Sequence, residues 1–261
     1  ELFNHSKGPT SYRFELEYFY QFGTGVVLLR RGSLFLLTPS HVVRNATANA
    51  YTNDSPFWVA REHRQPIDHA DFLMPMRLID LDPEGKEDRD VLVAEFATSF
   101  RPVNEYLNWD DRSSFVLRLK DAAGATGLVV GYPAQLNAYS YVGPELRQFA
   151  NIVRATFRGR VAVEGDQVWF ENETHQPDFD YAGLSGGLVI CSVEGQPKCL
   201  GIVVSSGSKG RRFRIVPFTL IRAWLEPFEG QPWQVIDEAY FLRRMTHHQM
   251  SYAELQDFMR T

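Results

Sequence analysis

The chain has 261 residues, of which 23% are charged, 44% hydrophobic and 13% aromatic, a composition that excludes intrinsic disorder and provides ample chain to bury a core. Its 27 basic and 32 acidic residues give a formal net charge of -5, so the chain as a whole lacks the excess of positive charge that is typical of nucleic-acid-binding proteins. Its apolar runs are far shorter than the roughly 18 residues that a membrane span needs, so we expect no membrane partner either.

The first ten residues contain turn formers and few core residues, which predicts a loose N-terminal lead over 1–10. Between residues 11 and 226 the chain changes to short apolar or alternating runs that are broken by Gly, Pro, Asn and Asp, the pattern of β-strands. The clearest runs are 25–29, 34–37, 91–96, 115–119, 128–130, 161–163, 168–171, 188–192 and 200–205. Because no long helical pattern intervenes, the sequence favours an all-β sandwich or barrel.

A weak boundary signal lies in residues 111–126, where D-A-A-G-A-T follows an expected strand. We expect this segment to divide the domain into two barrels of similar size, about 11–120 and 121–226. After Pro217, apolar residues at helical spacing predict a short helix that Pro227 stops.

The last part of the chain, 227–261, is expected to be a helical C-terminal extension. Residues 233–261 show two amphipathic patterns, and Ser251 with Glu254 fits a capping box for the second. This extension is expected to pack on the second barrel, to contact a protein partner or another subunit, or to lead into a further domain.

The two cysteines, Cys191 and Cys199, are too few for a disulfide framework. They flank the turn signal Glu194-Gly195, which predicts facing strands of one hairpin. Two buried thiols are the favoured state, with a cross-strand disulfide as the alternative. Two thiols and the lack of an apolar leader favour a cytoplasmic location.

The string Gly183-Leu184-Ser185-Gly186-Gly187 is the most informative in the chain. Glycines permit backbone conformations that present a serine with its neighbouring NH groups converging on one point, and such a nest stabilises an oxyanion. A serine hydroxyl also needs a base and a carboxylate that orients the base. His41, just after an expected strand, and Asp90, at the start of another, are the candidates.

In combination these motifs resemble the trypsin-like serine peptidases of the chymotrypsin fold. Residues 23–27 and 36–43 resemble that family's opening G-T-G-f and l-T-a-a-H-v-v, residues 90–93 resemble D-i-A-v, and residues 183–187 match G-x-S-G-G. The order His, Asp, Ser and the spacings of 49 and 95 residues also fit the family. The resemblance covers about residues 12–222.

This resemblance implies two antiparallel six-stranded β-barrels with an active site between them. Ser185 would be the nucleophile, His41 the general base and then acid, and Asp90 the group that holds His41 in the right tautomer. The backbone NH groups of Gly183 and Ser185 would form the oxyanion hole. The implied activity is that of a serine endopeptidase, which acts on proteins or peptides through an acyl-enzyme and needs no cofactor and no metal.

The chain departs from secreted animal members of the family at two informative positions. Leu184 stands where those members have Asp before the nucleophile, and Val42 stands where they have Cys after the histidine. The usual disulfides are also missing, so the pattern is closer to bacterial and HtrA-like members.

Four residues are candidates for substrate binding. Phe179, six residues before the nucleophile, is expected near the floor of the primary pocket, and it is not the Asp that would select Arg or Lys. Val204, Ser205 and Ser206 are expected to form the strand edge that pairs with substrate. A small or apolar side chain before the scissile bond is favoured.

Several alternatives stay open at this stage. Asp88 lies two residues from Asp90 and is a second candidate carboxylate. His63, His69 and Asp71 fit no zinc pattern, so we expect no metal site there.

Two other functions also remain. The string G-x-S-x-G also occurs in esterases of the α/β-hydrolase fold, whose residue order Ser, Asp, His would be completed by Asp237 and His247. The local pattern argues against this fold, because polar residues precede Ser185 and a strand-like run follows it, where the fold needs a strand before the serine and a helix after it. The other alternative is a catalytically inactive, trypsin-like binding module.

Overall fold

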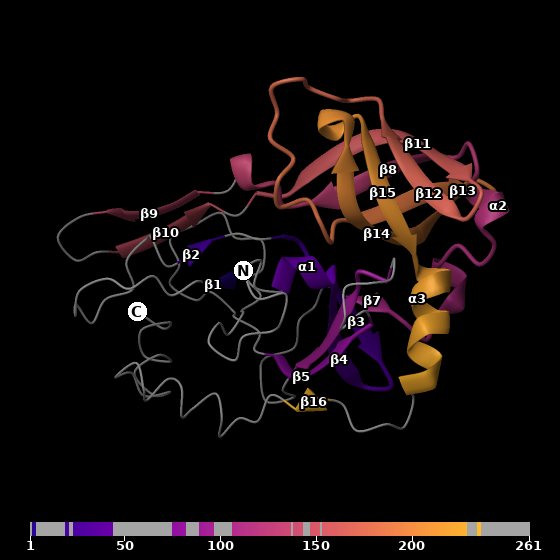
Figure 1. Ribbon diagram of the computed structural model, residues 1–261, viewed down its shortest axis with the longest axis horizontal. Coiled ribbons are helices and arrows are strands. Elements are labelled where there is room, and N and C mark those ends of the chain that lie inside the picture. Colours follow the sequence, from indigo (N-terminus) through magenta and orange to yellow (C-terminus); the bar gives the residue numbers. More distant parts are fainter. Residues whose placement is uncertain are drawn as a thin grey trace.

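The computed structural model describes residues 2–3, 19–20, 23–43, 75–81, 89–96, 106–136, 138–142, 147–151, 153–228 and 234–235. Most regular elements in these ranges are strands, which confirms the all-β prediction. They form one closed barrel and a second six-stranded sheet, as Figure 1 shows. None of the helices within these ranges is long and apolar enough to cross a membrane.

The closed barrel forms the second half of the domain, and each neighbouring pair of its strands is antiparallel. Around the barrel the strands are β11 (Ala155–Glu164), β12 (Gln167–Asn172), β15 (Arg212–Pro217), β14 (Gln196–Gly207), β13 (Leu188–Val193) and β8 (Thr126–Gly131). Alternate residues of β11 and β12 face inward and are buried, as period-two patterning dictates. Phe170 and Phe213 stack within this interior.

The other half of the domain is a six-stranded sheet that is open in the described part of the chain. In order across the sheet the strands are β16 (Gln234–Val235), β5 (Pro75–Asp80), β6 (Leu92–Phe96), β4 (Ser33–Thr38), β3 (Val26–Arg30) and β7 (Leu107–Asn108). All its neighbours are antiparallel except β3 and β7.

The remaining elements are short. Two further strand pairs are β1 (Leu2–Phe3) with β2 (Phe19–Tyr20), and β9 (Ala138–Val142) with β10 (Arg147–Asn151). The helices are α1 (Ser40–Val43), α2 (Leu119–Ala122) and α3 (Phe218–Leu225), and the 3-10 turns are η2 (Arg112–Ser114), η3 (Ala134–Leu136), η4 (Ser208–Gly210) and η5 (Glu226–Phe228). Leu2–Phe3 belong to the expected N-terminal lead and nevertheless form a strand.

Tight turns set the register of two hairpins. Arg31 and Gly32, between β3 and β4, have φ of 48° and 82°, and Glu194 and Gly195, between β13 and β14, have φ of 51° and 74°. Two consecutive positive φ values are typical of the two-residue turn whose twist matches that of the flanking strands. The hairpin predicted from Glu194-Gly195 is therefore confirmed.

The two cysteines lie on this β13–β14 hairpin as free thiols. They are offset by one position, since Cys191 pairs with Lys198 and Ile190 pairs with Cys199. Cys191 packs in the interior of the closed barrel, whereas Cys199 packs in the core between the two halves. Because their side chains point to opposite faces of the barrel wall, a cross-strand disulfide does not fit, and the expected buried thiols are confirmed.

One hydrophobic core joins the two halves of the domain. It contains Leu28 and Leu37 from the first sheet together with Ile202 and Val216 from the barrel. At its centre the rings of Trp109, Phe115 and Phe218 pack edge to face, with centroids 5.0 to 5.8 Å apart. The two halves are therefore held as one unit, which positions the residues at their junction.

The segment that connects the two halves of the domain differs from the sequence prediction. The strand expected over 115–119 is absent: Phe115 makes one isolated bridge, and α2 begins at Leu119. This apolar run reflects burial in the shared core, where Phe115 is 2% exposed. The helix predicted after Pro217 is confirmed as α3, which ends at Leu225.

In the expected C-terminal extension, 227–261, the structure describes only residues 227–228 and 234–235. Gln234–Val235 pair with β5 as a strand where the sequence predicted a helix, because the edge of the first sheet offers them a hydrogen-bonding partner. The capping box at Ser251 and the second amphipathic pattern lie outside the described residues.

Candidate active site

His41 is presented by the short helix α1, which follows β4 directly. Ser40 is fully buried and Val42 is 6% exposed. Since both neighbours point into the protein, the side chain of His41 points outward, and 49% of it is exposed. The local sequence thus holds a histidine on a rigid turn with its ring open to a ligand.

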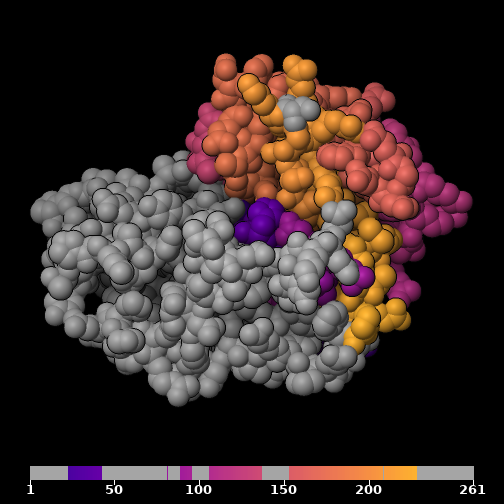
Figure 2. Space-filling model, viewed as in Figure 1, coloured from indigo at the N-terminus to yellow at the C-terminus, as the bar shows by residue number. Residues whose placement is uncertain are grey.

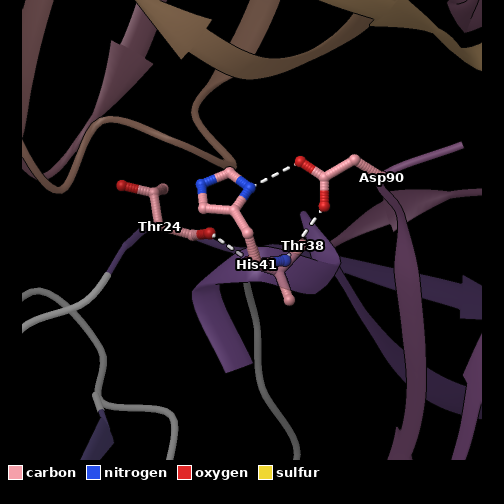
Figure 3. Close-up of polar contacts among 4 residues, drawn as sticks. All are labelled: Thr24, Thr38, His41 and Asp90. Atoms are coloured by element: carbon pink, nitrogen blue, oxygen red, sulfur yellow. Dashed lines mark hydrogen bonds and ion pairs between the residues drawn. The ribbon is translucent and has the colours of Figure 1, made fainter. Parts of the chain in front are cut away.

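Asp90 lies just before β6, and the pairing of β6 with β4 brings it beside His41. Thr38, at the end of β4, pairs with Leu92 near the start of β6. The carboxylate of Asp90 accepts two hydrogen bonds from His41, one from the main-chain NH at 2.9 Å and one from ring Nδ1 at 2.5 Å (Figure 3). Because an ionised carboxylate only accepts, a neutral His41 ring carries its hydrogen on Nδ1, and its Nε2 lone pair is then available.

The loop around Ser185 is held by hydrogen bonds to four successive carbonyl groups. The carbonyl of Ala182 accepts from the NH of Ala134 at 2.7 Å, and that of Leu184 accepts from the NH of Gly187 at 2.8 Å. Between them, the carbonyls of Gly183 and Ser185 accept from Thr24, from its hydroxyl at 2.9 Å and its NH at 2.7 Å. The orientation of every peptide group beside Ser185 is therefore fixed.

The same bonding leaves two donors in this loop unused. The NH of Leu184 donates to Tyr181, and that of Gly186 donates to Val203. Within the described residues, the NH groups of Gly183 and Ser185 donate to no protein acceptor. Buried or half-buried NH groups are nearly always paired, so two open donors, one on Ser185 itself and one two residues before it, are suited to bind an anionic oxygen.

Glycine is required in this loop for two different reasons. Gly183 and Gly186 have φ of 83° and 91°, a region that other residues rarely adopt. A Cβ on Gly186 would also lie 1.7 Å from the carbonyl oxygen of Thr24. The glycines therefore allow the serine loop of the barrel to approach the chain of the first sheet.

The histidine and serine segments meet at this close approach. A Cβ on Gly23 would lie 2.7 Å from the side chain of Val42 and 2.9 Å from the carbonyl oxygen of Ser185. One on Gly186 would lie 3.1 Å from Pro39. Figure 2 shows atoms from residues 23–43, in indigo, against the orange part of the barrel. In the described structure no hydrogen bond joins the ring of His41 to the hydroxyl of Ser185.

The candidate substrate residues lie in three environments. Phe179 is half-buried, and its ring packs edge to face on Phe157 and Tyr181, at 5.6 and 4.9 Å, against the barrel interior. Val204 is 4% exposed in the shared core, and it is skipped in the β14–β15 pairing, which makes it a bulge. Ser205 and Ser206, beyond the bulge, are exposed.

Sequence reasoning did not single out two of the residues that organise this junction. Thr24 is 6% exposed and bonds to both halves, and the hydroxyl of Thr38, 2% exposed, donates to the carbonyl of Thr24 at 2.8 Å (Figure 3). The available signal was Thr24 between two glycines, because a polar residue in a chain segment that must pack closely needs buried partners.

The structure bears on the esterase alternative but not on the alternative site residues. Asp88, His63, His69, Asp71, Asp237 and His247 all lie outside the described residues. The segment after Ser185 becomes strand β13, so the strand, turn and helix of an esterase nucleophile elbow are not formed there.

No family model matches the chain, and no curated protein matches it. Solved structures do match. The atomic-resolution structure of HBP is 13% identical, with a TM-score of 0.52, and the match covers 80% of this chain and 86% of that chain. The structure of human heparin binding protein is 14% identical, with the same TM-score and coverage. These likenesses, together with the closed barrel and second sheet, show that the chain has the chymotrypsin-like fold.

Proposed function

We propose that the protein is a serine endopeptidase that hydrolyses peptide bonds through an acyl-enzyme. The observation that carries this proposal is the His41–Asp90 pair beside a serine loop with two unused NH donors. A structural loop has no need for open donors, whereas acyl transfer needs a base, an orienting carboxylate and donors for a developing oxyanion.

In the proposed mechanism each group does one task. His41 Nε2 takes the proton of Ser185 as its Oγ attacks the scissile carbonyl, and Asp90 stabilises the imidazolium that forms. The carbonyl oxygen, now negative, accepts hydrogen bonds from the NH groups of Gly183 and Ser185. His41 then protonates the leaving amine. Water next attacks the acyl-enzyme while His41 takes its proton, and His41 returns a proton to Ser185 as the acid product leaves. The hydrogen bond between His41 and Ser185 forms in the complex, since such bonds are often open in free enzymes.

The proposed substrate is a protein or peptide that pairs with β14. Beyond the bulge at Val204, residues Ser205 and Ser206 pair with β15 on one side. On the other side β13 pairs with β14 only as far as Ile202, so within the described residues no strand pairs with Ser205 and Ser206 there. An extended substrate can add there by main-chain hydrogen bonds. With Phe179 near the primary pocket, a small or apolar residue is favoured before the scissile bond. Faster cleavage after Arg than after Val or Ala in a peptide library contradicts this specificity.

Within this proposal, the chain is of the bacterial or HtrA-like type and acts in the cytoplasm. The support is Val42 and Leu184 at the positions where secreted animal members have Cys and Asp. A chain with only two cysteines, which lie in two different cores, has no disulfide framework of the kind that secreted proteins use.

The test of the proposed activity is covalent labelling by a fluorophosphonate, which reacts with activated serines. The wild-type protein is expected to be labelled, Ser185→Ala to be unlabelled, and Ser192→Ala, which removes an exposed serine on β13, to be labelled normally. Labelling that survives Ser185→Ala refutes the nucleophile assignment.

A second candidate, a binding module without catalysis, is favoured by one observation: the matching structures are named for binding heparin. The net charge of this chain, -5, argues against heparin as its ligand, because heparin is a polyanion and is attracted to basic surfaces. Failure of the wild-type protein to react with the fluorophosphonate or to cleave any peptide supports this candidate over the peptidase.

A further inference from the structure

We propose that the hydroxyl of Thr24 is a positioning group that sets the peptide between the two oxyanion donors. This inference rests on the proposed peptidase function. Thr24 belongs to the first half of the domain, just before β3, whereas both donors belong to the second half. A residue of one half would thereby control the electrostatics of a site on the other.

The hydroxyl of Thr24 has two hydrogen-bond partners, and only one of them is an acceptor. The hydroxyl accepts from the main-chain NH of Tyr132, just after β8, at 2.9 Å. Because that NH can only donate, the hydroxyl hydrogen is directed to its other partner, the carbonyl oxygen of Gly183, at 2.9 Å. The contact with Gly183 is therefore a directed bond rather than a chance proximity.

The Gly183–Leu184 peptide is the one that lies between the two open donors. Its carbonyl is held by Thr24 and its NH by Tyr181, so a rotation of the peptide breaks both bonds. Gly183 has φ of 83° and no side chain to resist rotation. The relative direction of the NH groups of Gly183 and Ser185 depends on this peptide, so the Thr24 hydroxyl sets their convergence.

The main chain of Thr24 also forms hydrogen bonds to both the serine loop and the histidine-bearing segment. Its NH donates to the carbonyl of Ser185 at 2.7 Å, and its carbonyl accepts from the hydroxyl of Thr38 at 2.8 Å. Thr38 is followed by the segment that carries His41. One buried residue thus connects the base-bearing segment with the peptides on both sides of the nucleophile.

The kinetic test uses Thr24→Val, which keeps the shape and the main-chain NH and removes the hydroxyl. We expect kcat to fall about 10- to 100-fold with KM within about threefold, because the loss acts on the oxyanion and not on substrate binding. Affinity for a peptide aldehyde, whose hemiacetal places an oxyanion in the hole, is expected to fall by a similar factor. Thr24→Ser is expected to restore kcat to within about threefold.

A matched control is Thr174→Val. The Thr174 hydroxyl also accepts a main-chain NH, from Arg158 at 3.1 Å, and donates to an oxygen, Oδ1 of Asn172 at 2.9 Å. This variant is expected to keep kcat within about twofold. If both valine variants lower the melting temperature and neither changes kcat or aldehyde affinity, Thr24 is merely structural and the proposal is wrong.

A second measurement does not depend on activity. Hydrogen exchange at the NH of Leu184, which donates to Tyr181 at 3.1 Å, is expected to accelerate in Thr24→Val and not in Thr174→Val. An unchanged rate overturns the proposal even if the wild-type protein proves to be inactive. Absence of fluorophosphonate labelling in the wild-type protein refutes the peptidase function alone. Should Thr24→Val not fold, Thr24→Ala, with room for water, takes its place in both measurements.

Discussion

Asp90 holds His41 at two points, since one carboxylate oxygen accepts from the main-chain NH at 2.9 Å and the other from ring Nδ1 at 2.5 Å. The main-chain bond fixes the carboxylate relative to helix α1, so the bond to the ring cannot be exchanged for another rotamer without loss of the first. Together the two bonds specify both the tautomer and the direction of the Nε2 lone pair, which is what a general base for Ser185 requires.

Asp90→Asn is expected to lower kcat about 10³- to 10⁴-fold with little change in stability. The Oδ1 atom of Asn still accepts from the main chain, but its amide group donates to the ring and favours the wrong tautomer. The measurement is hydrolysis of a peptide substrate together with thermal unfolding. Asp111→Asn is the control, because that carboxylate accepts from Ser113 and Ser114 and does not contact His41. Activity retained in Asp90→Asn would make Asp88 the candidate carboxylate.

Gly186→Ala is expected to abolish labelling of Ser185 by a fluorophosphonate. The new Cβ would meet the carbonyl oxygen of Thr24 at 1.7 Å and must displace the serine loop from the first sheet. Gly195→Ala is a matched control, since Gly195 also has a positive φ, 74°, but open space around it. Both variants carry backbone strain of about 1–3 kcal/mol, so only the clash separates them. Equal labelling of the two variants would show that the close approach is unimportant.

The sequence was sufficient for the residues whose position depends on local pattern. Apolar or alternating runs predicted β3, β4, β6, β8 and β11–β14, Glu194-Gly195 predicted its hairpin, and the strand ends predicted where His41 and Asp90 lie. These features follow from a few neighbouring residues, because strand period and turn chemistry act over short distances.

Contacts between segments that are distant in the chain could not be predicted from these local patterns. The bond from Thr24 to Gly183 spans 159 positions in the chain, and no local pattern encodes it. Phe115 was predicted in a strand because its neighbours are apolar, yet its burial comes from packing on Trp109 and Phe218. The strand at Gln234–Val235 likewise depends on β5, since Gln234 pairs with Leu78, 156 positions earlier, and an open sheet edge can pair with a segment whatever its own propensity.

The buried thiols predict how stability changes at alkaline pH. Burial raises the pKa of Cys191 and of Cys199 from 9.0 to about 11. In the unfolded chain both thiols ionise first, so between pH 9.0 and about 11 the unfolded state binds fewer protons and the free energy of unfolding falls as pH rises. Below pH 8 or so these groups contribute no pH dependence.

This prediction is measured by urea unfolding at pH 8 and at pH 10. The wild-type protein is expected to lose stability between the two, and the double variant Cys191→Ala/Cys199→Ala to lose less, whatever its stability at pH 8. Native protein at pH 7.5 is also expected to react with iodoacetamide only after denaturation, because the thiolate is the reactive form. Rapid alkylation of the native protein would contradict the burial of both thiols.

The core between the two halves predicts how the domain unfolds. Phe218 is fully buried and packs on Trp109 and Phe115, in a cluster that includes residues of both the first sheet and the barrel. Phe218→Ala is expected to lower the free energy of unfolding by about 3–5 kcal/mol, through lost burial and the cavity left behind. Leu117→Ala, at a residue 59% exposed, is expected to change it by less than about 0.5 kcal/mol. Because the serine loop and its histidine lie on opposite halves, labelling of Ser185 should disappear in the same transition that exposes the barrel. Labelling that persists in Phe218→Ala above its unfolding midpoint would show that the site does not depend on this shared core.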